Sequence, residues 1–275
     1  MAFPISVRTL HIVGTFFLLS VLASHSSAQV LAVPKRYTCY HVTEGPKIDG
    51  RLDEAAWKDA AWTDLFVDIE GDKRTKPAMA TRAKMLWDDQ YLYIAAELEE
   101  EDVWAYQSVK DQIVFYENDF EVFIDPDGDN LNYFEMEVNA INNTFDLFLP
   151  KPYRSKGKPD HDYDMNGFRS AIEIKGTLNN PADRDSSWTV EMAIPFDDLK
   201  YGDFVTPNPK DGTVWRLNFS RVNWQTDIKN GKYERKKDPK TGKLIPEYNW
   251  VWSPQGVIDM HRPEKWGYLE FAKKD

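Results

Sequence analysis

Short segments in which apolar and polar residues alternate constrain the fold of this chain more than any other feature. In residues 119–125, Phe120, Val122 and Ile124 fall on one side, and residues 133–140 alternate in the same way. A period of two is typical of a β-strand with one buried face. Further candidate strands, separated by turn-forming residues, are 82–87, 91–98, 145–149, 168–174, 188–194, 214–222 and 267–271. About ten short strands predict an all-β fold, either a β-sandwich or an open barrel.

Helix is scarce, and no repeat or linker divides the chain. Asp53 is placed to cap one short helix with Trp57 on its buried side. We therefore expect residues 29–37 to form a loose N-terminal lead, followed by one β domain over residues 38–273 with short peripheral helices. Two long segments, 151–164 and 227–249, are rich in charged residues and are predicted to be solvated loops. Loops at one end of a sandwich commonly carry binding, so either segment is also a candidate ligand rim.

The first 28 residues have the pattern of a secretory signal peptide. Arg8 precedes an apolar run over residues 12–23, and the small residues 26–28 form a plausible cleavage site before Gln29. The run is short for a membrane span, which needs about 20 residues, so an uncleaved anchor is the lesser alternative. No other stretch is apolar enough to span a bilayer. The sequence predicts an exported protein, periplasmic or extracellular, without a membrane span after cleavage.

The net charge and the cysteine content limit which ligands and metals this chain is expected to bind. The net charge of −11 makes nucleic acid an unlikely ligand, because the phosphate backbone would be repelled. The single cysteine, Cys39, permits neither an intramolecular disulfide nor a cysteine-based zinc site. We interpret it as a small, half-buried apolar side chain.

Catalytic signatures are sparse. The nucleophile-elbow, phosphate-loop and zinc-protease motifs are absent from the sequence, and the three histidines after residue 28 are not at ligand spacing. Glu121, Glu135 and Glu137 share the outward side of two adjacent predicted strands. Two such carboxylates could hydrolyse a glycosidic bond if they lay about 5–9.5 Å apart. With 45 acidic residues in the chain such pairs also arise by chance.

A candidate metal site lies in the segment that follows the first of these strands. Asp125, Asp127 and Asp129 alternate around Gly128, and carboxylates at that spacing suit Ca²⁺. The alternative is an ordinary β-turn, since Asp-Pro, Gly and Asn all favour turns.

The ten tryptophans offer the better functional signal. A sugar ring presents apolar faces on which an aromatic plane can stack, and polar side chains then bind its hydroxyls. Trp104 and Trp224 stand at the ends of predicted strands, outside apolar patterns, and are candidates for ligand contact. The patterns around six others predict packing in the core or against it: Trp57, Trp87, Trp188, Trp215, Trp250 and Trp252.

Six motifs in order resemble carbohydrate-binding module family 9 and its secreted, DOMON-like members, over residues 40–272. They are IDGRLDEAAW (48–57), LWDDQYLY (86–93), NDFEVFIDPD (118–127), EVNA (137–140), WTVEMAIP (188–195) and RPEKWG (262–267). The resemblance implies an immunoglobulin-like double sheet that holds a terminal sugar between two tryptophans and carries structural Ca²⁺. It places Trp104 and Trp224 as that pair, with Glu121, Asn139 and Arg221 near the cleft. By strand alternation, however, Arg221 and Trp224 should point to opposite faces.

The favoured hypothesis is an exported, non-catalytic protein that captures plant-type xylan- or cellulose-like saccharides and supports their breakdown, beside separate glycoside hydrolases. Two alternatives stay open. One is a glycoside hydrolase that uses Glu121 and Glu137. The other is a haem or redox module, in which Met260 and His261, or Met165 and His161, would supply ligands.

Overall fold

The computed structural model describes residues 33–274, which form one compact unit, and the predicted signal peptide lies outside them. The described chain holds one short α-helix, α1 (Ala55–Asp59), and four 3₁₀ turns, η1 (Gly71–Lys73), η2 (Val114–Tyr116), η3 (Tyr153–Ser155) and η4 (Pro263–Lys265). The strands are β1 (Arg36–His41), β2 (Val67–Asp68), β3 (Thr81–Trp87), β4 (Tyr91–Glu99), β5 (Asp119–Asp125), β6 (Tyr133–Asn139), β7 (Thr144–Leu149), β8 (Arg169–Lys175), β9 (Ser187–Pro195), β10 (Val214–Asn223), β11 (Thr226–Lys229), β12 (Lys232–Arg235), β13 (Tyr248–Val251) and β14 (Gly267–Ala272).

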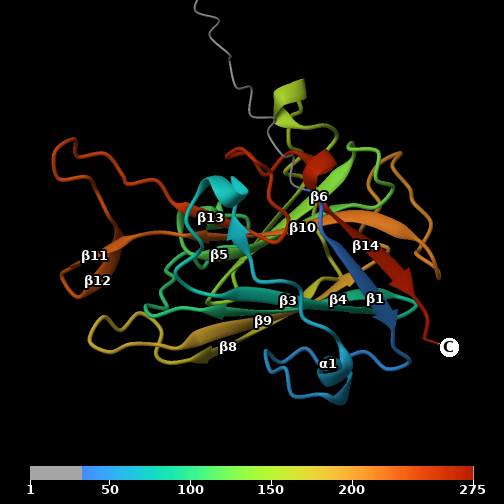
Figure 1. Cartoon of the computed structure of the whole chain (residues 1–275), viewed down its shortest axis with the longest axis horizontal. Coiled ribbons are helices and arrows are strands. Elements are labelled where there is room, and N and C mark those ends of the chain that lie inside the picture. Colours follow the sequence, from blue (N-terminus) through green and yellow to red (C-terminus); the bar gives the residue numbers. More distant parts are fainter. Residues whose placement is uncertain (1–32, 275) are drawn as a thin grey trace, which may run out of the picture. The chain divides into compact units, whose positions relative to one another are not determined.

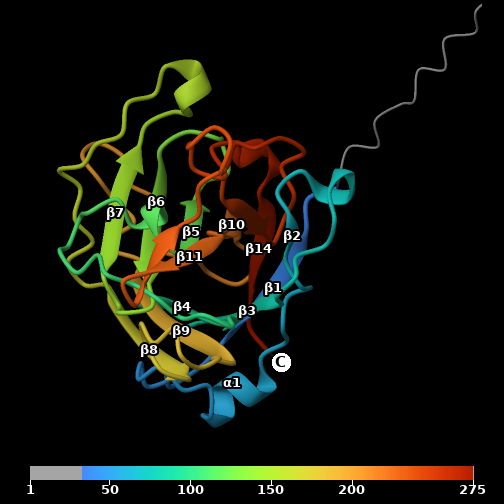
Figure 2. The ribbon, with the colours of Figure 1, turned by 90° about the vertical axis from the view of Figure 1, so that its left-hand side faces the viewer.

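The strands form two facing layers, which confirms the predicted all-β sandwich. The strand order is β7-β6-β5-β10-β14-β1-β3-β4-β9-β8, with β13 and β2 attached beside β10. Figure 2 shows the layer that contains β5, β6 and β7 above the layer of β3, β4, β8 and β9. The layers are joined along one side, because β1 pairs in parallel with both β14 and β3. The sandwich is thus one curled sheet rather than two separate sheets.

The main core lies between the two layers. Phe120, Val122 and Ile124 of β5 face inward, and Met85 and Ile94 approach them from the other layer. The alternation that predicted these strands is the alternation between this core and the outside. The tryptophans predicted to pack are all buried, with at most 4% of their surface exposed: Trp57, Trp87, Trp188, Trp215, Trp250 and Trp252. Cys39 is a free thiol that is fully buried, where a half-buried side chain was predicted.

The outer face of β5 and β6 is covered as well. Phe123 and Tyr133, which point away from the main core, pack against Val251, Met260 and Trp266 of the C-terminal segment. Every residue of β5 and β6 is therefore buried, although only alternate residues reach the main core. This second layer of packing decides where the acidic residues of these strands lie.

The IDGRLDEAAW motif is held by the carboxylate of Glu191, on the outer face of the layer that contains β3, β4, β8 and β9. Glu191 of β9 accepts hydrogen bonds from the backbone N–H groups of Asp49 (2.9 Å) and Gly50 (2.7 Å) and from the Trp57 indole N–H (2.6 Å). Gly50 has a φ of +86°, and a Cβ there would lie 2.6 Å from the carbonyl carbon of Ile172, so glycine is required. In Figure 2, α1, which carries Trp57, lies outside this layer.

The structure contains elements that were not predicted. β1 was not predicted, and it begins within residues 29–37, which were expected to form a loose lead. The segment 227–249, expected to be a loop, holds most of the hairpin β11–β12 and the start of β13. The helix N-cap is Glu54 rather than Asp53, without a side-chain hydrogen bond, so that capping prediction is wrong. Within residues 33–274, no helix is both long and apolar enough to span a bilayer.

Candidate functional site

Trp104 and Trp224 meet at the end of the sandwich where the hairpin β11–β12 folds back. Trp104 follows β4 and Trp224 follows β10, and both pack with Val222 and Tyr233, with Phe115 at the border of the cluster. In Figure 1, β11 and β12 lie at the left of the picture, at this end of the sandwich. The rings are 4% and 8% exposed, so the expectation of two exposed indoles is wrong. The physical reason is Tyr233, on the unpredicted hairpin, which covers them.

A cavity of about 360 Å³ opens beside this aromatic cluster. Its wall combines two aromatic rings with charged and amide side chains, and consists of Trp104, Gln107, Tyr116, Glu117, Glu234, Arg235, Lys237 and Leu244. The Arg235 guanidinium lies over the rings of Trp224 (4.7 Å) and Tyr116 (5.1 Å). The indole N–H of Trp104 is buried without a hydrogen-bond partner, while that of Trp224 donates to the Phe115 carbonyl (2.9 Å). Trp104 thus lines the cavity and carries a buried indole N–H whose hydrogen-bonding capacity is unused.

Asn139 supports this wall from behind. Its side-chain N–H donates to the Gln107 carbonyl (2.9 Å) and to Glu117 (3.3 Å). Glu117 in turn accepts hydrogen bonds from the backbone of Tyr106 (2.8 Å) and Gln107. Asn139 itself is fully buried. The structure therefore brings Asn139 close to the cavity as a positioning residue, and it does not place its side chain on the surface.

Arg221 lies on the other side of β10, as strand alternation predicts. It is 1% exposed and forms an ion pair with Glu100 (2.9 Å), and it also donates to the Thr81 hydroxyl (2.9 Å). Its guanidinium lies 5.0 Å from the centre of the Trp250 ring. Arg221 is therefore part of the interior, and its contacts explain its position without a ligand.

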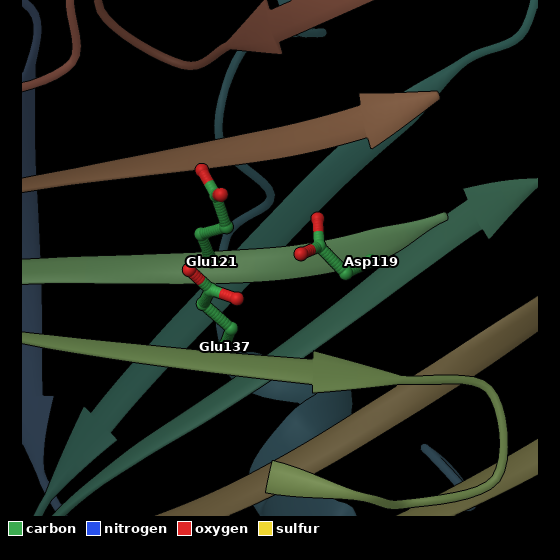
Figure 3. Close-up of side chains that lie close together, drawn as sticks. All are labelled: Asp119, Glu121 and Glu137. Atoms are coloured by element: carbon green, nitrogen blue, oxygen red, sulfur yellow. The ribbon is translucent and has the colours of Figure 1, made fainter. Parts of the chain in front are cut away.

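Glu121 is separated from the cavity wall and belongs to a buried acidic cluster. Figure 3 shows Glu121 and Asp119 on β5 and Glu137 on β6, with the side chains of Asp119 and Glu137 extending toward Glu121 and the Glu121 carboxylate extending away from β6. Ligand oxygens of the three residues all lie within 4.8 Å of one another. Burial raises the pKa of Glu121 to about 7. Burial, and then the charge of Glu121, raise the pKa values of Asp119 and Glu137 well above the usual range.

The predicted turn over Asp125, Asp127 and Asp129 also brings three carboxylates within 4.8 Å of one another. Asp125 already accepts hydrogen bonds from the backbone of Gly128 (2.8 Å) and Asn130 (2.9 Å). Asp127 and Asp129 are exposed. The oxygen ligands suit Ca²⁺ in kind, while the hydrogen bonds of Asp125 are those of a turn that closes on its own backbone.

Glu121, Glu137 and His261, which the two alternative functions would use, are enclosed by packing. Glu121 and Glu137 point away from the main core, as predicted, but they are only 5% and 2% exposed because the C-terminal segment covers their face. His261 packs edge-on against Tyr153, and its Nδ1 lies 3.0 Å from the Tyr133 hydroxyl. His261 is therefore held by packing contacts and one short contact to a hydroxyl, and the carboxylates of Glu121 and Glu137 are enclosed.

Comparison with known families identifies the family to which this chain belongs. The profile of the family described as "Carbohydrate family 9 binding domain-like" matches residues 48–243. The chain belongs to this family. That assignment agrees with the resemblance carried by the six sequence motifs and with the curled β-sandwich.

Relatives of this family 9 chain include modules of much larger enzymes. It is 29% identical over 153 residues to exoglucanase XynX of Acetivibrio thermocellus, and 28% identical over 170 residues to endo-1,4-beta-xylanase A of Thermoanaerobacterium saccharolyticum. These matches cover 55% and 62% of this chain but only 12% of either enzyme. An "Extracellular protein" of Arthroderma benhamiae is 30% identical over 154 residues, which cover 54% of this chain and 65% of that protein.

Solved structures share the fold. A family 9 carbohydrate-binding module from Caldicellulosiruptor kristjanssonii, in complex with cellotriose, superposes with a TM-score of 0.55 at 15% identity and covers 88% of this chain and 95% of its own. A protein from Bacteroides uniformis superposes with a TM-score of 0.61 at 17% identity and covers 87% of this chain and all of its own.

Proposed function

We propose that this protein is an exported, non-catalytic carbohydrate-binding protein whose saccharide occupies the cavity beside Trp104. The observation that carries the proposal is the meeting of Trp104 and Trp224, predicted from sequence alone to lie outside the core, next to a cavity with a polar rim. At about 360 Å³ the cavity falls at the small end of the range for ligand pockets. That size suits one or two sugar residues at the end of a chain.

The chemistry of the cavity wall suits a neutral polyol. Tyr116, which is 45% exposed, offers a ring face for stacking, and the free indole N–H of Trp104 can donate to a hydroxyl. Gln107, Glu117 and Arg235 supply further donors and acceptors around the rim. Xylan- or cellulose-like saccharides are the proposed class, supported by the xylanase relatives and by the cellotriose complex of a module with the same fold.

Export and partnership with hydrolases are parts of the same proposal. The signal-peptide pattern of residues 1–28 and the extracellular relative support export. Because the related modules occur within xylan-degrading enzymes, we propose that this protein acts beside glycoside hydrolases on the same polymer. A structural Ca²⁺ at Asp125, Asp127 and Asp129, whose carboxylate oxygens lie within 4.8 Å of one another, is part of the same proposal.

Tyr116→Ala is expected to weaken binding of cello- or xylo-oligosaccharides about 2- to 12-fold, because one stacking contact is worth about 0.5–1.5 kcal/mol. Trp104→Phe removes the unpaired indole N–H together with part of the ring that lines the cavity, and should cost a similar factor. Calorimetric titration with cellobiose, cellotriose and xylotriose measures both effects.

The matched control for this experiment is Trp62→Ala. Trp62 is the one tryptophan of the described chain that is not buried, and it lines a separate groove with Arg82 and Glu97 on the opposite layer. Its replacement should leave affinity unchanged. Equal affinity in the wild type, Tyr116→Ala and Trp104→Phe proteins would place the saccharide elsewhere, and loss of binding in Trp62→Ala would point to that second groove.

A further inference from the structure

A groove of about 520 Å³ lies on the outer face of the layer that contains β3, β4, β8 and β9, and it shares no lining residue with the Trp104 cavity. Trp62 and residues 51–53 line it, so we call it the Trp62 groove. In Figure 2, α1, which follows residues 51–53 closely in the chain, marks this face. Its remaining strand residues include a row paired across the layer, namely Arg82, Glu97, Thr189 and Glu173.

Trp62 gives this groove an aromatic surface. The Arg82 guanidinium lies 4.1 Å and the Lys84 ammonium 4.4 Å from the centre of its ring. Both cations come from the outward side of β3, so they hold the ring from the strand side. The ring is nevertheless partly exposed. A partly exposed indole that is fixed in this way can stack on the apolar face of a sugar ring.

Two cations of the groove are only loosely paired. Glu97 accepts two hydrogen bonds from Arg82 (3.1 and 2.7 Å), whereas the Lys175 ammonium approaches it only to 3.8 Å. Arg51 approaches Glu173 no closer than 3.4 Å. Within residues 33–274, neither Arg51 nor Lys175 donates a side-chain hydrogen bond, and their side chains are 62% and 56% exposed. Both cations can therefore turn to an anion that enters the groove.

Lys84 adds positive charge behind the ring. It is 7% exposed, it donates to the Trp57 carbonyl, and in the described part of the chain it forms no ion pair with a carboxylate. Four cations thus stand against three carboxylates around the groove, although the whole chain carries a net charge of −11. A local surplus of positive charge on an acidic protein favours an anionic ligand at that place.

The mixture of groups narrows the chemistry of that ligand. A simple anion would use the cations but neither the indole nor the carboxylates, and a neutral sugar would leave the loosely paired cations unused. A sugar that bears a carboxylate uses all three kinds of group. Its apolar face can stack on Trp62, its carboxylate can accept from Arg51 or Lys175, and its hydroxyls can donate to Glu97.

We propose that the Trp62 groove binds a uronic acid unit, a pyranose that carries a carboxylate, as part of a polysaccharide. The groove volume lies within the range of about 300–1,000 Å³ that is usual for ligand pockets. Arg51, Asp53 and Lys175 at the groove are exposed, which leaves room for an attached chain to continue into solvent. The groove is separate from the cavity proposed for neutral saccharides, so one molecule could hold a polymer at two points.

The test uses two sugars that differ only in charge-bearing chemistry at one carbon. Methyl β-D-glucuronoside has a carboxylate where methyl β-D-glucoside has a hydroxymethyl group, and both are blocked at the anomeric carbon as in a polymer. Binding is followed by NMR of the tryptophan indole N–H signals of ¹⁵N-labelled protein, with the Trp62 signal assigned from Trp62→Phe. Acetate is titrated as a simple anion, and glucuronate as an unlinked sugar acid.

We expect the glucuronoside to shift the Trp62 signal and to bind about tenfold or more tightly than the glucoside, because only the former offers a charge-assisted hydrogen bond. Arg51→Gln/Lys175→Gln should weaken glucuronoside binding by at least about the same factor, and added salt should weaken it in the wild type. Lys229→Gln is the matched control. It removes a cation that is 51% exposed and paired with Glu234 on the hairpin β11–β12, and should leave glucuronoside binding unchanged.

The proposal is overturned if the glucuronoside does not move the Trp62 signal, or if Arg51→Gln/Lys175→Gln binds it as tightly as the wild type does. Equal binding of the glucoside would make the groove a site for neutral sugars, and equal binding of acetate a site for simple anions, and both results contradict the proposal. Binding of free glucuronate alone would exclude a unit linked in a polymer. Cellotriose titrations report on the Trp104 cavity, so the proposed function and this inference can fail separately.

Discussion

Replacing Glu100 by alanine is expected to lower the free energy of unfolding by about 3–5 kcal/mol, because it leaves the buried guanidinium of Arg221 without its counter-charge. One oxygen of Glu100 accepts hydrogen bonds from Arg221, Asn118 and Asn223, all at 2.9 Å. These partners belong to β10 and to the residue just before β5, and Asn118 also accepts the backbone N–H of Trp224 (2.8 Å). Loss of Glu100 should therefore loosen the aromatic corner as well as the core.

Urea unfolding measures this change, and the adjacent residue supplies the control. The side chain of Glu101 is 70% exposed, and it approaches Arg184 no closer than 3.5 Å. Exposed pairs of this kind contribute little, so Glu101→Ala should change stability by less than about 0.5 kcal/mol. A loss of similar size in both variants would show that the buried ion pair has no special role. Saccharide affinity, measured well below the unfolding midpoint, should fall only in Glu100→Ala.

The sequence predicted the strands well where their burial pattern was local. The nine predicted strands coincide with β3 to β10 and β14 to within about two residues at each end. Their alternation reflects one face in the main core, which each segment carries in its own residues. β1 has the same alternation, with Tyr37 and Cys39 buried and Arg36 and Thr38 exposed. It was missed because its position beside the leader suggested a loose segment.

The hairpin β11–β12 was not predicted, although the sequence contains a signal for it. Asn230 and Gly231 join its strands with φ angles of +51° and +73°, and Asn-Gly between two short segments is the preferred turn for a two-residue hairpin. The surrounding lysines and arginines suggested a solvated loop instead. The error matters, because Tyr233 and Arg235 on this hairpin cover Trp104 and Trp224 and complete the cavity.

The burial of the outer face of β5 and β6 could not be predicted from local sequence patterns. Strand alternation correctly placed Glu121, Glu135 and Glu137 on the side of the strands away from the main core. Acidic side chains on that side would ordinarily be exposed to solvent. Met260 and Trp266, more than 120 residues away in the chain, cover that face instead. Only the tertiary packing of the C-terminal segment turns three outward-facing acids into a buried cluster.

Glu191→Ala is expected to cost at least about 3 kcal/mol of stability, because three N–H donors lose their acceptor at once. Glu191 is fully buried and serves the backbone of Asp49 and Gly50 and the indole of Trp57. Each buried donor left unpaired costs about 1–3 kcal/mol. Glu191→Gln keeps one acceptor oxygen and should lose less, whereas the half-exposed Glu173 on the neighbouring strand β8 can be replaced by alanine with little effect.

A double-mutant cycle separates this anchor from simple loss of packing. Trp57→Phe removes one indole N–H bond to a carboxylate and should alone cost about 1.5–3 kcal/mol, since such charge-assisted bonds are the stronger ones. If Glu191 holds the motif through that bond, the double variant Glu191→Ala/Trp57→Phe should lose less than the sum of the single changes, by about 0.5–3 kcal/mol. Strict additivity would mean that Trp57 is held by its apolar neighbours Leu86, Tyr93 and Ala95, and that the carboxylate serves the backbone of the motif alone.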